Sequence, residues 1–234
     1  MFFAFWTDRF SIFIRVLDLK FLLAIFAKII IVGHRINTME IIPIGAPLTR
    51  ELIQNKVFVY PTDTCYGIGC DFSNEELINR IYSIKGRGEH KPLSIMVDSL
   101  EMFKLYGEVN ERTEKLIQTY LPGDLTIIVP KTSRVPSFLN PHISTIGIRI
   151  PNHAFSLSLI QTLGRPIITT SANKTGEENP YMVQQIISAF ASDKEKPDII
   201  FDGGTIPITP PSTIVEVRRD TLHLIRQGRL QVNL

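Results

Sequence analysis

From Met39 onward, the hydrophobic and polar positions of the chain follow two spacings, which predict alternating strands and helices. Short apolar runs are typical of buried strands, whereas apolar residues that recur every three or four positions indicate helices packed against a sheet. We predict strands at 57–60, 93–97, 125–129, 145–150, 167–170, 199–201, 213–217 and 222–226, and helices at 74–85, 100–106, 110–121, 154–163 and 181–190. Because strands outnumber helices late in the chain, the sheet is expected to be mixed.

Capping and turn signals mark where several of these elements begin or end. Ser73 precedes Glu76 by three positions, which is the capping-box spacing, so Ser73 is the predicted N-cap of the helix that ends near Lys85. A tight turn at Arg219-Asp220 is predicted to join the last two strands. Polar loops rich in Pro and Gly, where a site would be built, lie at 86–92, 131–141, 173–180 and 203–212.

The first 38 residues have a different pattern, rich in Phe, Ile and Leu with scattered charges. Their longest apolar run, Phe21 to Val32, is interrupted by Lys28 and is shorter than the roughly 20 residues that a bilayer span needs. Three interpretations stay open: a membrane-surface helix, a poor signal peptide, or translated sequence upstream of a start at Met39. We favour the last, and therefore predict an extension at 1–38, a single domain at 39–234 and no membrane partner.

Composition narrows the class of protein. With 234 residues, 44% hydrophobic and 21% charged, the chain can form one globular α/β domain. A net charge of +2 gives no general electrostatic drive toward long nucleic-acid tracts. Cys65 and Cys70 are the two cysteines, too few for a disulfide framework or a four-cysteine zinc site, so we expect buried thiols in a reducing cytoplasm.

Four cations are the candidates for holding phosphate groups. The chain contains neither a GxxxxGK[ST] loop nor a GxGxxG loop after a strand, so Lys and Arg side chains would have to bind a nucleotide. The candidates are Lys85, Arg87, Arg149 and Arg226. Lys85 could instead complement a helix C-terminus, and Arg226 could be a solvated strand end. Arg149 lies inside an apolar strand, where a charge is costly unless a pocket or an anion meets it.

Two strands bring polar side chains to a common face. Thr145 and Arg149 are four residues apart, so they share a face, and Gly147 between them would leave room for a ligand. Thr169 and Ser171 share a face at the end of the next apolar strand, where open α/β sheets bind ligands. Ser171 and the nearby Asn173 could equally serve turn chemistry.

Seven ordered motifs resemble the YrdC family from about residue 40 to 230. They are Pro61-Thr62-Asp63-Thr64-Cys65-Tyr66-Gly67-Ile68-Gly69, Lys85-x-Arg87 followed by Pro92-Leu93-Ser94, Leu121-Pro122-Gly123-Asp124-Leu125-Thr126, Gly147-Ile148-Arg149-Ile150-Pro151-Asn152-His153, Ser171-Ala172-Asn173, Pro211-Ser212-Thr213-Ile214-Val215 and Ile225-Arg226-Gln227-Gly228. Asp124 stands where the family usually has proline, Asn179 where it usually has serine, and Cys65 where it often has valine, which we read as a core position. His153 fits its motif and is interpreted as a structural turn histidine.

The resemblance implies a twisted α/β fold, a mostly mixed sheet with flanking helices and a large concave pocket, that makes threonylcarbamoyl-AMP and pyrophosphate from L-threonine, bicarbonate or CO2, and ATP with Mg²⁺. It implies catalytic roles for Lys85, Arg87 and Arg149, threonine binding by Thr62, Ser94, Arg149, Thr169 and Ser212, and ATP binding by Lys85, Arg87, Thr145, Ser171, Asn173, Asn179 and Arg226. It implies no protein-held metal. The product would pass, in the cytoplasm, to a tRNA threonylcarbamoyl transferase complex.

Two other functions stay open. The concave face could bind double-stranded RNA or tRNA, because shape-based RNA binding needs no sharp motif. The chain could also be a paralogue that keeps the nucleotide site but acts on a different acceptor. Hydroxyl side chains that converge on one small pocket would favour the synthase, since RNA binding does not require them.

Overall fold

The computed structural model describes residues 34–36, 39–88, 91–219 and 221–233. Of the extension predicted at 1–38, all but 34–36 lies outside the described residues, so its boundary stays a prediction. The segment Arg35–Leu234 forms one compact unit. Within the part of the chain that is described, no helix has the length and apolar character needed to cross a bilayer.

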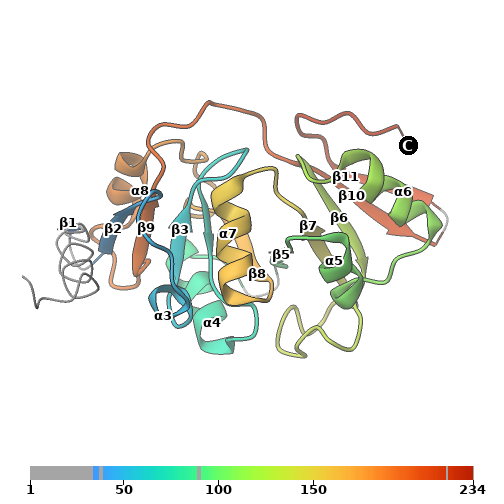
Figure 1. The fold of residues 1–234 in the computed structure, drawn as a ribbon, viewed down its shortest axis with the longest axis horizontal. Helices are drawn as coiled ribbons and strands as arrows, with labels where there is room; N and C mark the ends of the chain where they lie inside the picture. Colours follow the sequence, from blue (N-terminus) through green and yellow to red (C-terminus); the bar gives the residue numbers. More distant parts are fainter. Residues whose placement is uncertain (1–33, 37–38, 89–90, 220, 234) are drawn as a thin grey trace, which may run out of the picture. The chain divides into compact units, whose positions relative to one another are not determined.

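A single mixed sheet of eleven strands forms the centre of the described structure (Figure 1). Its order is β1-β2-β9-β3-β4-β8-β5-β7-β6-β10-β11. The strands are β1 (His34–Ile36), β2 (Met39–Pro43), β3 (Phe58–Tyr60), β4 (Gly67–Gly69), β5 (Ser94–Met96), β6 (Leu125–Pro130), β7 (Thr145–Arg149), β8 (Ile167–Ser171), β9 (Ile199–Asp202), β10 (Thr213–Arg218) and β11 (Thr221–Arg226). Parallel pairs such as β5–β7 alternate with antiparallel pairs such as β6–β7, which confirms the predicted mixed sheet.

Six helices flank this sheet among the described residues. They are α3 (Arg50–Ile53), α4 (Glu75–Lys85), α5 (Leu100–Tyr106), α6 (Glu111–Tyr120), α7 (Ala154–Leu163) and α8 (Val183–Phe190). Every predicted strand and helix is present, with ends that differ by a residue or two. β10 and β11 pair antiparallel from Arg218 and Thr221, as a tight connection requires, although Asp220 of the predicted turn lies outside the described residues.

β1, β2, α3 and β4 were not predicted. β4 is short and contains Gly67 and Gly69, so it has no apolar run to reveal it. A Cβ at Gly69 would lie 2.1 Å from the carbonyl oxygen of Ile168, so only glycine permits this close approach of β4 and β8.

The predicted cap of α4 was wrong by one residue. Asn74 is the N-cap, and its Oδ1 accepts a hydrogen bond from the backbone N–H of Leu77. The N–H and the hydroxyl of Ser73 both donate to Oδ1 of Asp71, at 2.9 and 2.7 Å. Because Asp71 engages Ser73 in a turn before the helix, the capping position moves to Asn74.

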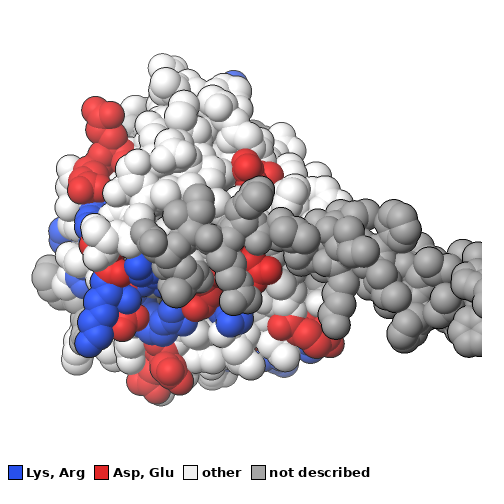
Figure 2. All heavy atoms as spheres, turned by 90° about the vertical axis from the view of Figure 1, so that its left-hand side faces the viewer, with Lys and Arg blue, Asp and Glu red and all other residues white. Residues whose placement is uncertain are grey.

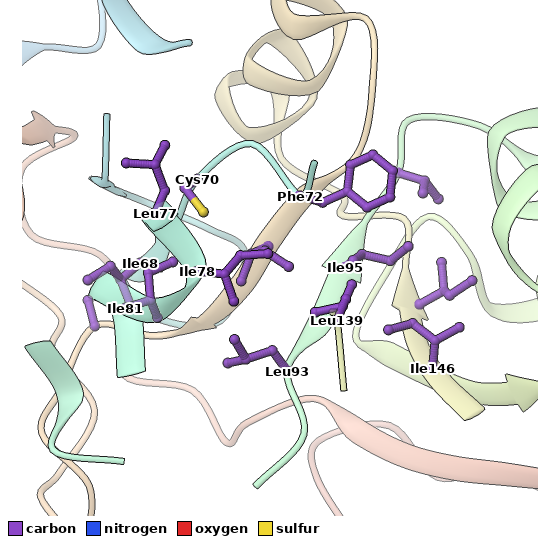
Figure 3. Packing of buried hydrophobic residues seen from close by; sticks show 14 of the residues in the cluster. Ile68, Cys70, Phe72, Leu77, Ile78, Ile81, Leu93, Ile95, Leu139 and Ile146 are labelled. Carbon is purple, nitrogen blue, oxygen red and sulfur yellow. The ribbon is translucent and has the colours of Figure 1, made fainter. Parts of the chain in front are cut away.

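Alternating residues of β3, β8 and β9 reach two separate hydrophobic layers. Val57 and Val59 face the larger layer, whereas Phe58 and Tyr60 face the smaller one. Residues of α7 such as Leu159 belong to the smaller layer. The larger layer includes a helix face of α4 that lies against β4 and the following residues, listed as Leu77, Ile78 and Ile81 beside Ile68 and Cys70 (Figure 3).

On β5, β6 and β7 the two faces differ in chemistry. Ile95, Ile127 and Ile148 are buried in the larger layer. Their neighbours in sequence therefore point to the opposite face, since side chains alternate along a strand. These neighbours include Ser94, Thr126, Gly147 and Arg149, which line or adjoin the cavity described below together with Met96, so the sheet presents mostly small and polar groups there. The site is built on this face.

Candidate active site over the central strands

A cavity of about 240 Å³ lies where most of the predicted site residues meet. Those that line it are Thr62, Arg87, Ser94, Arg149, Thr169, Ser171, Asn179, Ser212 and Arg226. Three predicted residues do not line it: Lys85, Thr145 and Asn173. The lining also includes Thr64, Cys65 and Thr126, to which the motifs led us to assign no role. The volume is below the roughly 300–1,000 Å³ of sites that enclose a drug-sized ligand, so the cavity suits a small group such as an amino acid.

Larger hollows lie elsewhere and do not gather the predicted residues. One of about 740 Å³, lined by residues such as Arg50, Asn74 and Arg165, lies at the N-terminal end of α4. It is open, and Arg50 and Arg165 are already engaged there, with the carbonyl of Leu163 and the carboxylate of Asp71. We therefore place the site at the smaller cavity, where cations and hydroxyls converge.

Four hydroxyl side chains form a row across neighbouring strands, which we call the hydroxyl row: Thr169, Ser94, Thr126 and Ser212. Ser94 of β5 pairs with Thr169 of β8, and Oγ1 of Thr126 lies 3.3 Å from Oγ of Ser212. Gly147 lies in the middle. A Cβ there would be 2.5 Å from Oγ of Ser94 and 3.3 Å from Cγ2 of Thr126. The space that Gly147 leaves is thus partly filled by Ser94, and only glycine allows the row to form.

The hydroxyls of the row differ in their hydrogen bonds. The phenol of Tyr60 donates to Oγ1 of Thr169 at 2.9 Å, and burial raises the pKa of Tyr60, so this phenol remains a donor. Nη2 of Arg226 donates to Oγ of Ser212 at 3.1 Å. The hydroxyl of Ser94, unlike its backbone in the β5–β8 pairing, has no hydrogen-bond partner among the described residues. Thr169 and Ser94 can therefore each donate a proton to a ligand.

Thr62 is engaged differently. Its hydroxyl donates to the carbonyl of Cys65 at 2.6 Å and accepts from the backbone N–H groups of Thr64 and Cys65 at 3.1 and 3.2 Å. These bonds shape the turn after β3. Thr62 lines the cavity with its hydroxyl proton already in use, so its predicted threonine contact would have to accept a proton or be apolar.

Arg149 is 5% exposed and lies between two carboxylates. Nη2 donates to Oδ1 of Asp63 at 2.6 Å and to Oδ1 of Asp124 at 3.1 Å, while Nε donates to the carbonyl of Gly123 at 3.0 Å. Nη1 has only the hydroxyl of Thr64, at 3.4 Å. Asp63 and Asp124 are absent from the cavity lining, so Nη1 is the edge available to a ligand. Burial, followed by the neighbouring Asp63, raises the pKa of Asp124.

Lys85 lies beneath the Ser171-Ala172-Asn173 loop. Its side chain is buried, and Nζ donates to the carbonyl oxygens of Ser171 and Asn173 and to Oδ1 of Asn173. Burial, and then the charge of Arg87, lowers the pKa of Lys85 to about 8. Lys85 and Asn173 therefore hold the loop that brings Ser171 to the cavity.

The remaining predicted residues occupy the rim or lie outside the cavity. Arg87 donates to the carbonyls of Lys91 and Pro92, at 3.3 and 2.8 Å. Nε and Nη2 of Arg226 donate to the carbonyl of Ser212. Asn179 lines both this cavity and an adjoining hollow of about 200 Å³ beneath the same loop. Thr145 begins β7, two residues before Gly147.

Cys65 and His153 clarify two sequence interpretations. Both cysteines are free and buried, as predicted, but Cys65 also lines the cavity, and burial raises the pKa of its thiol. Nδ1 of His153 accepts from the N–H of Ser156 at the start of α7, which confirms its structural role. In the described ranges, His, Cys, Asp and Glu side chains do not gather in groups of three that could hold a metal ion.

The fold and the cavity define a class of protein: a mixed α/β sheet that carries a small, cationic and hydroxyl-lined binding site on one face. The chain belongs to the family whose model is named Sua5_yciO_yrdC and described as telomere recombination, which matches residues 50–228.

Several relatives agree with this membership. A protein of Methanocaldococcus jannaschii is 36% identical over 190 residues, covering 79% of this chain and 86% of its own length. A threonylcarbamoyl-AMP synthase of Pyrococcus abyssi is 34% identical, and the match covers 86% of this chain but 58% of that protein. The crystal structure of P. abyssi Sua5 complexed with L-threonine is similar with a TM-score of 0.69 and 33% identity, over 74% of this chain and 50% of that one.

Proposed function

We propose that the chain is an L-threonylcarbamoyladenylate synthase, which joins L-threonine, bicarbonate or CO2, and ATP into threonylcarbamoyl-AMP and pyrophosphate. The observation that carries the proposal is the cavity in which Arg149 Nη1 and the hydroxyl row face one small volume. Family membership and relatives that bear this activity as their name support it.

Binding and alignment are the main tasks of the residues in this reaction. The threonine amine adds to CO2 to form a carbamate, and a carbamate oxygen attacks the α-phosphorus of ATP as pyrophosphate leaves. Such a transfer depends on positioning and charge neutralisation more than on a protein nucleophile. Nη1 of Arg149 would hold the threonine carboxylate, and Ser94 and Thr169 can donate to polar groups of the bound amino acid or its carbamate.

The nucleotide would lie toward the Ser171-Ala172-Asn173 loop and the cations at the rim. Arg87 and Arg226 line the cavity and neutralise phosphate charge, while Lys85 holds the loop from below. ATP would arrive as its Mg²⁺ complex. The cavity lining contains no carboxylate, so the residues fit an ion carried by phosphate oxygens and water, which is how Mg²⁺ is commonly held.

The product is an activated carbamate that an acceptor must consume. We propose that a tRNA threonylcarbamoyl transferase complex receives it for the adenosine next to the anticodon, and that both reactions take place in the cytoplasm. The two free thiols agree with a reducing compartment.

RNA binding as the main function finds less support. RNA binding does not require the hydroxyl row that lines the cavity. On the side of the molecule where β1 and β2 lie, and outside the grey parts of Figure 2, Lys and Arg side chains lie next to Asp and Glu side chains. A paralogue with a different acceptor would need the same nucleotide-binding residues. Such a paralogue would not need the hydroxyl row, which therefore favours the synthase.

The test is incubation of the purified chain with MgATP, bicarbonate and each amino acid in turn, followed by mass detection of the acyl-adenylate and by pyrophosphate release. We expect an acyl-adenylate, threonylcarbamoyl-AMP, only in the incubation that contains threonine. Arg149→Lys should abolish most of this product, because the ammonium keeps the charge between Asp63 and Asp124 but loses the Nη1 edge. Arg218→Lys, at an exposed ion pair with Glu216, is the matched control and should be fully active. No adenylate from any amino acid would refute the proposal.

A further inference from the structure

Thr126 lines the cavity from β6 and is 6% exposed, yet the motifs gave it no role. Its Oγ1 lies 3.3 Å from Oγ of Ser212, and either oxygen can be the donor. Oγ of Ser212 already accepts from Nη2 of Arg226. One hydroxyl proton joins the two oxygens, so the other proton of the pair has no acceptor among the described residues. The Thr126–Ser212 pair can therefore donate one hydrogen bond into the cavity and can also accept one.

The sheet order places this pair within reach of a ligand held at Arg149. Thr126 is on β6, next to β7, which carries Arg149. Ile127 pairs with Ile148, so Thr126, which precedes Ile127, and Arg149, which follows Ile148, lie side by side on strands about 4.8 Å apart. Thr169, on β8, is two strands from β7, or roughly 10 Å. An amino acid whose carboxylate binds Nη1 of Arg149 can thus meet the Thr126–Ser212 pair with its side chain, while Thr169 lies farther along the cavity.

The other hydroxyls are less suited to recognise a substrate hydroxyl. The proton of Thr62 is bound to the carbonyl of Cys65. Ser94 is also next to β7, on the β5 side, where the cavity continues toward Thr169 and Ser171. The amine that becomes the carbamate must extend toward the nucleotide, which the loop at Ser171 would hold. The side chain of the amino acid then points the opposite way, toward β6.

From these contacts we infer that Thr126, paired with Ser212, is a specificity-determining residue that recognises the side-chain hydroxyl of the amino-acid substrate. This inference rests on the proposed function and adds to it the residue that separates threonine from valine. The two amino acids have the same shape, so a polar partner must distinguish them. A site built to hydrogen-bond a hydroxyl rejects the analogue that lacks it, because its own polar groups stay unpaired.

The experiment compares kcat/KM for threonine with kcat/KM for valine in the wild type and in Thr126→Val, which removes the hydroxyl and keeps the shape. We expect kcat/KM for threonine to fall by about ten- to a hundredfold and the value for valine to stay or rise, so that the ratio between them falls by at least that factor. Calorimetric titration of the two amino acids should show the same loss for threonine alone.

The matched control is Thr113→Val, the same change at a buried threonine in the first turn of α6. The hydroxyl of Thr113 donates to Oδ1 of Asn110, and Thr113 does not line the cavity. In Thr113→Val, the ratio of kcat/KM for threonine to kcat/KM for valine should equal the wild-type ratio. If Thr126→Val does not fold, Thr126→Ser and Thr126→Ala replace it, and the ratio should be kept in the first and lost in the second.

These measurements distinguish a failure of the proposed function from a failure of the inference about Thr126. A wild-type protein that adenylates no amino acid refutes the proposed function. A wild type that prefers threonine, with Thr126→Val lowering kcat/KM for threonine and valine alike, overturns the inference, because Thr126 would then only support Ser212.

Discussion

Individual side chains in this site are held by contacts from several strands, and Lys85 shows the consequence. Its ammonium is buried under a loop and donates to backbone carbonyls of that loop. Its charge is therefore used in positioning Ser171 and Asn173, and any contribution to phosphate binding passes through them. The lowered pKa makes this arrangement dependent on pH within a range that experiments can reach.

We predict that ATP affinity falls as the pH rises through about 8, because the neutral amine of Lys85 donates weaker hydrogen bonds to the carbonyl of Asn173 and holds the nucleotide-binding loop less firmly. The folded pKa of about 8 lies below the ordinary 10.5. The free energy of unfolding responds in the opposite direction to ATP affinity. The contribution of Lys85 to it is complete above pH 10.5 and is lost as the pH falls to about 8, with a slope of up to roughly 1.4 kcal/mol per pH unit. Calorimetric titration of ATP at pH 7 and pH 9 is the measurement. Lys85→Met should bind ATP weakly at both, and an equally steep decline in that variant would contradict the assignment.

A side chain added at Gly147 tests whether the hydroxyl row is needed for activity. Gly147→Ala should lower threonine-dependent pyrophosphate release by about tenfold or more and reduce the free energy of unfolding by about 1–3 kcal/mol, because the new methyl group collides with Ser94. Gly45→Ala is the matched control, since a Cβ there meets nothing within 4 Å. Chemical denaturation and pyrophosphate release measure the two effects. Normal activity in Gly147→Ala would show that Ser94 can move without loss.

At the scale of elements, α4 connects the core to the site. Leu77, Ile78 and Ile81 anchor it in the larger hydrophobic layer, and its last residue, Lys85, lies under the active-site loop. Its C-cap is Gly86, with φ of 55°, a left-handed conformation that glycine adopts without strain. The start of α4 therefore matters for where Lys85 lies, ten residues along the helix.

We predict that Asn74→Ala lowers the free energy of unfolding by about 1 kcal/mol, the usual cost of losing an N-cap. Asn79→Ala, at an exposed position of the same helix, should change it by less than about 0.5 kcal/mol. Urea denaturation of both variants is the measurement. Equal effects would mean that Asn74 does not cap α4 in solution.

At the scale of the whole molecule, the site depends on two kinds of strand pairing in one sheet. β5 and β7 run parallel, while β6–β7 and β5–β8 run antiparallel. This pairing brings together residues that are distant in sequence, such as Ser94 and Thr169. Among the described residues, those that form the hydrophobic layers beneath them all lie at or after Met39.

We predict that a fragment starting at Met39 folds and is as active as the full chain, because the described residues of both hydrophobic layers and of the cavity lining lie within 39–234. The short edge strand β1 would be lost with little cost. Thermal unfolding, size-exclusion chromatography and adenylate formation compare the fragment with the full chain. Aggregation of the fragment, or a melting temperature lower by about 10 °C, would mean that the N-terminal segment contributes to the fold.

The sequence by itself determined most of the strands and helices, although not β1, β2 or α3, because the apolar periods and turns that mark them are local and act along the chain. It also led to most of the cavity lining through motifs such as Pro61–Gly69 and Gly147–His153. It did not reveal β4, which has glycines in place of an apolar run, nor the cap at Asn74, because Asp71 competes for Ser73.

Only the tertiary structure decided which side chains share protons and charges. The parallel pairing of β6 with β10 places Thr126 opposite Ile214 and so brings its hydroxyl within 3.3 Å of the hydroxyl of Ser212. The chain turns that bring Asp63 and Asp124 to Arg149 leave one nitrogen for a ligand. These neighbours are 25 to 86 residues apart in sequence. Hydrogen bonds and ion pairs act over a few ångströms in space, so no pattern along the chain could assign them.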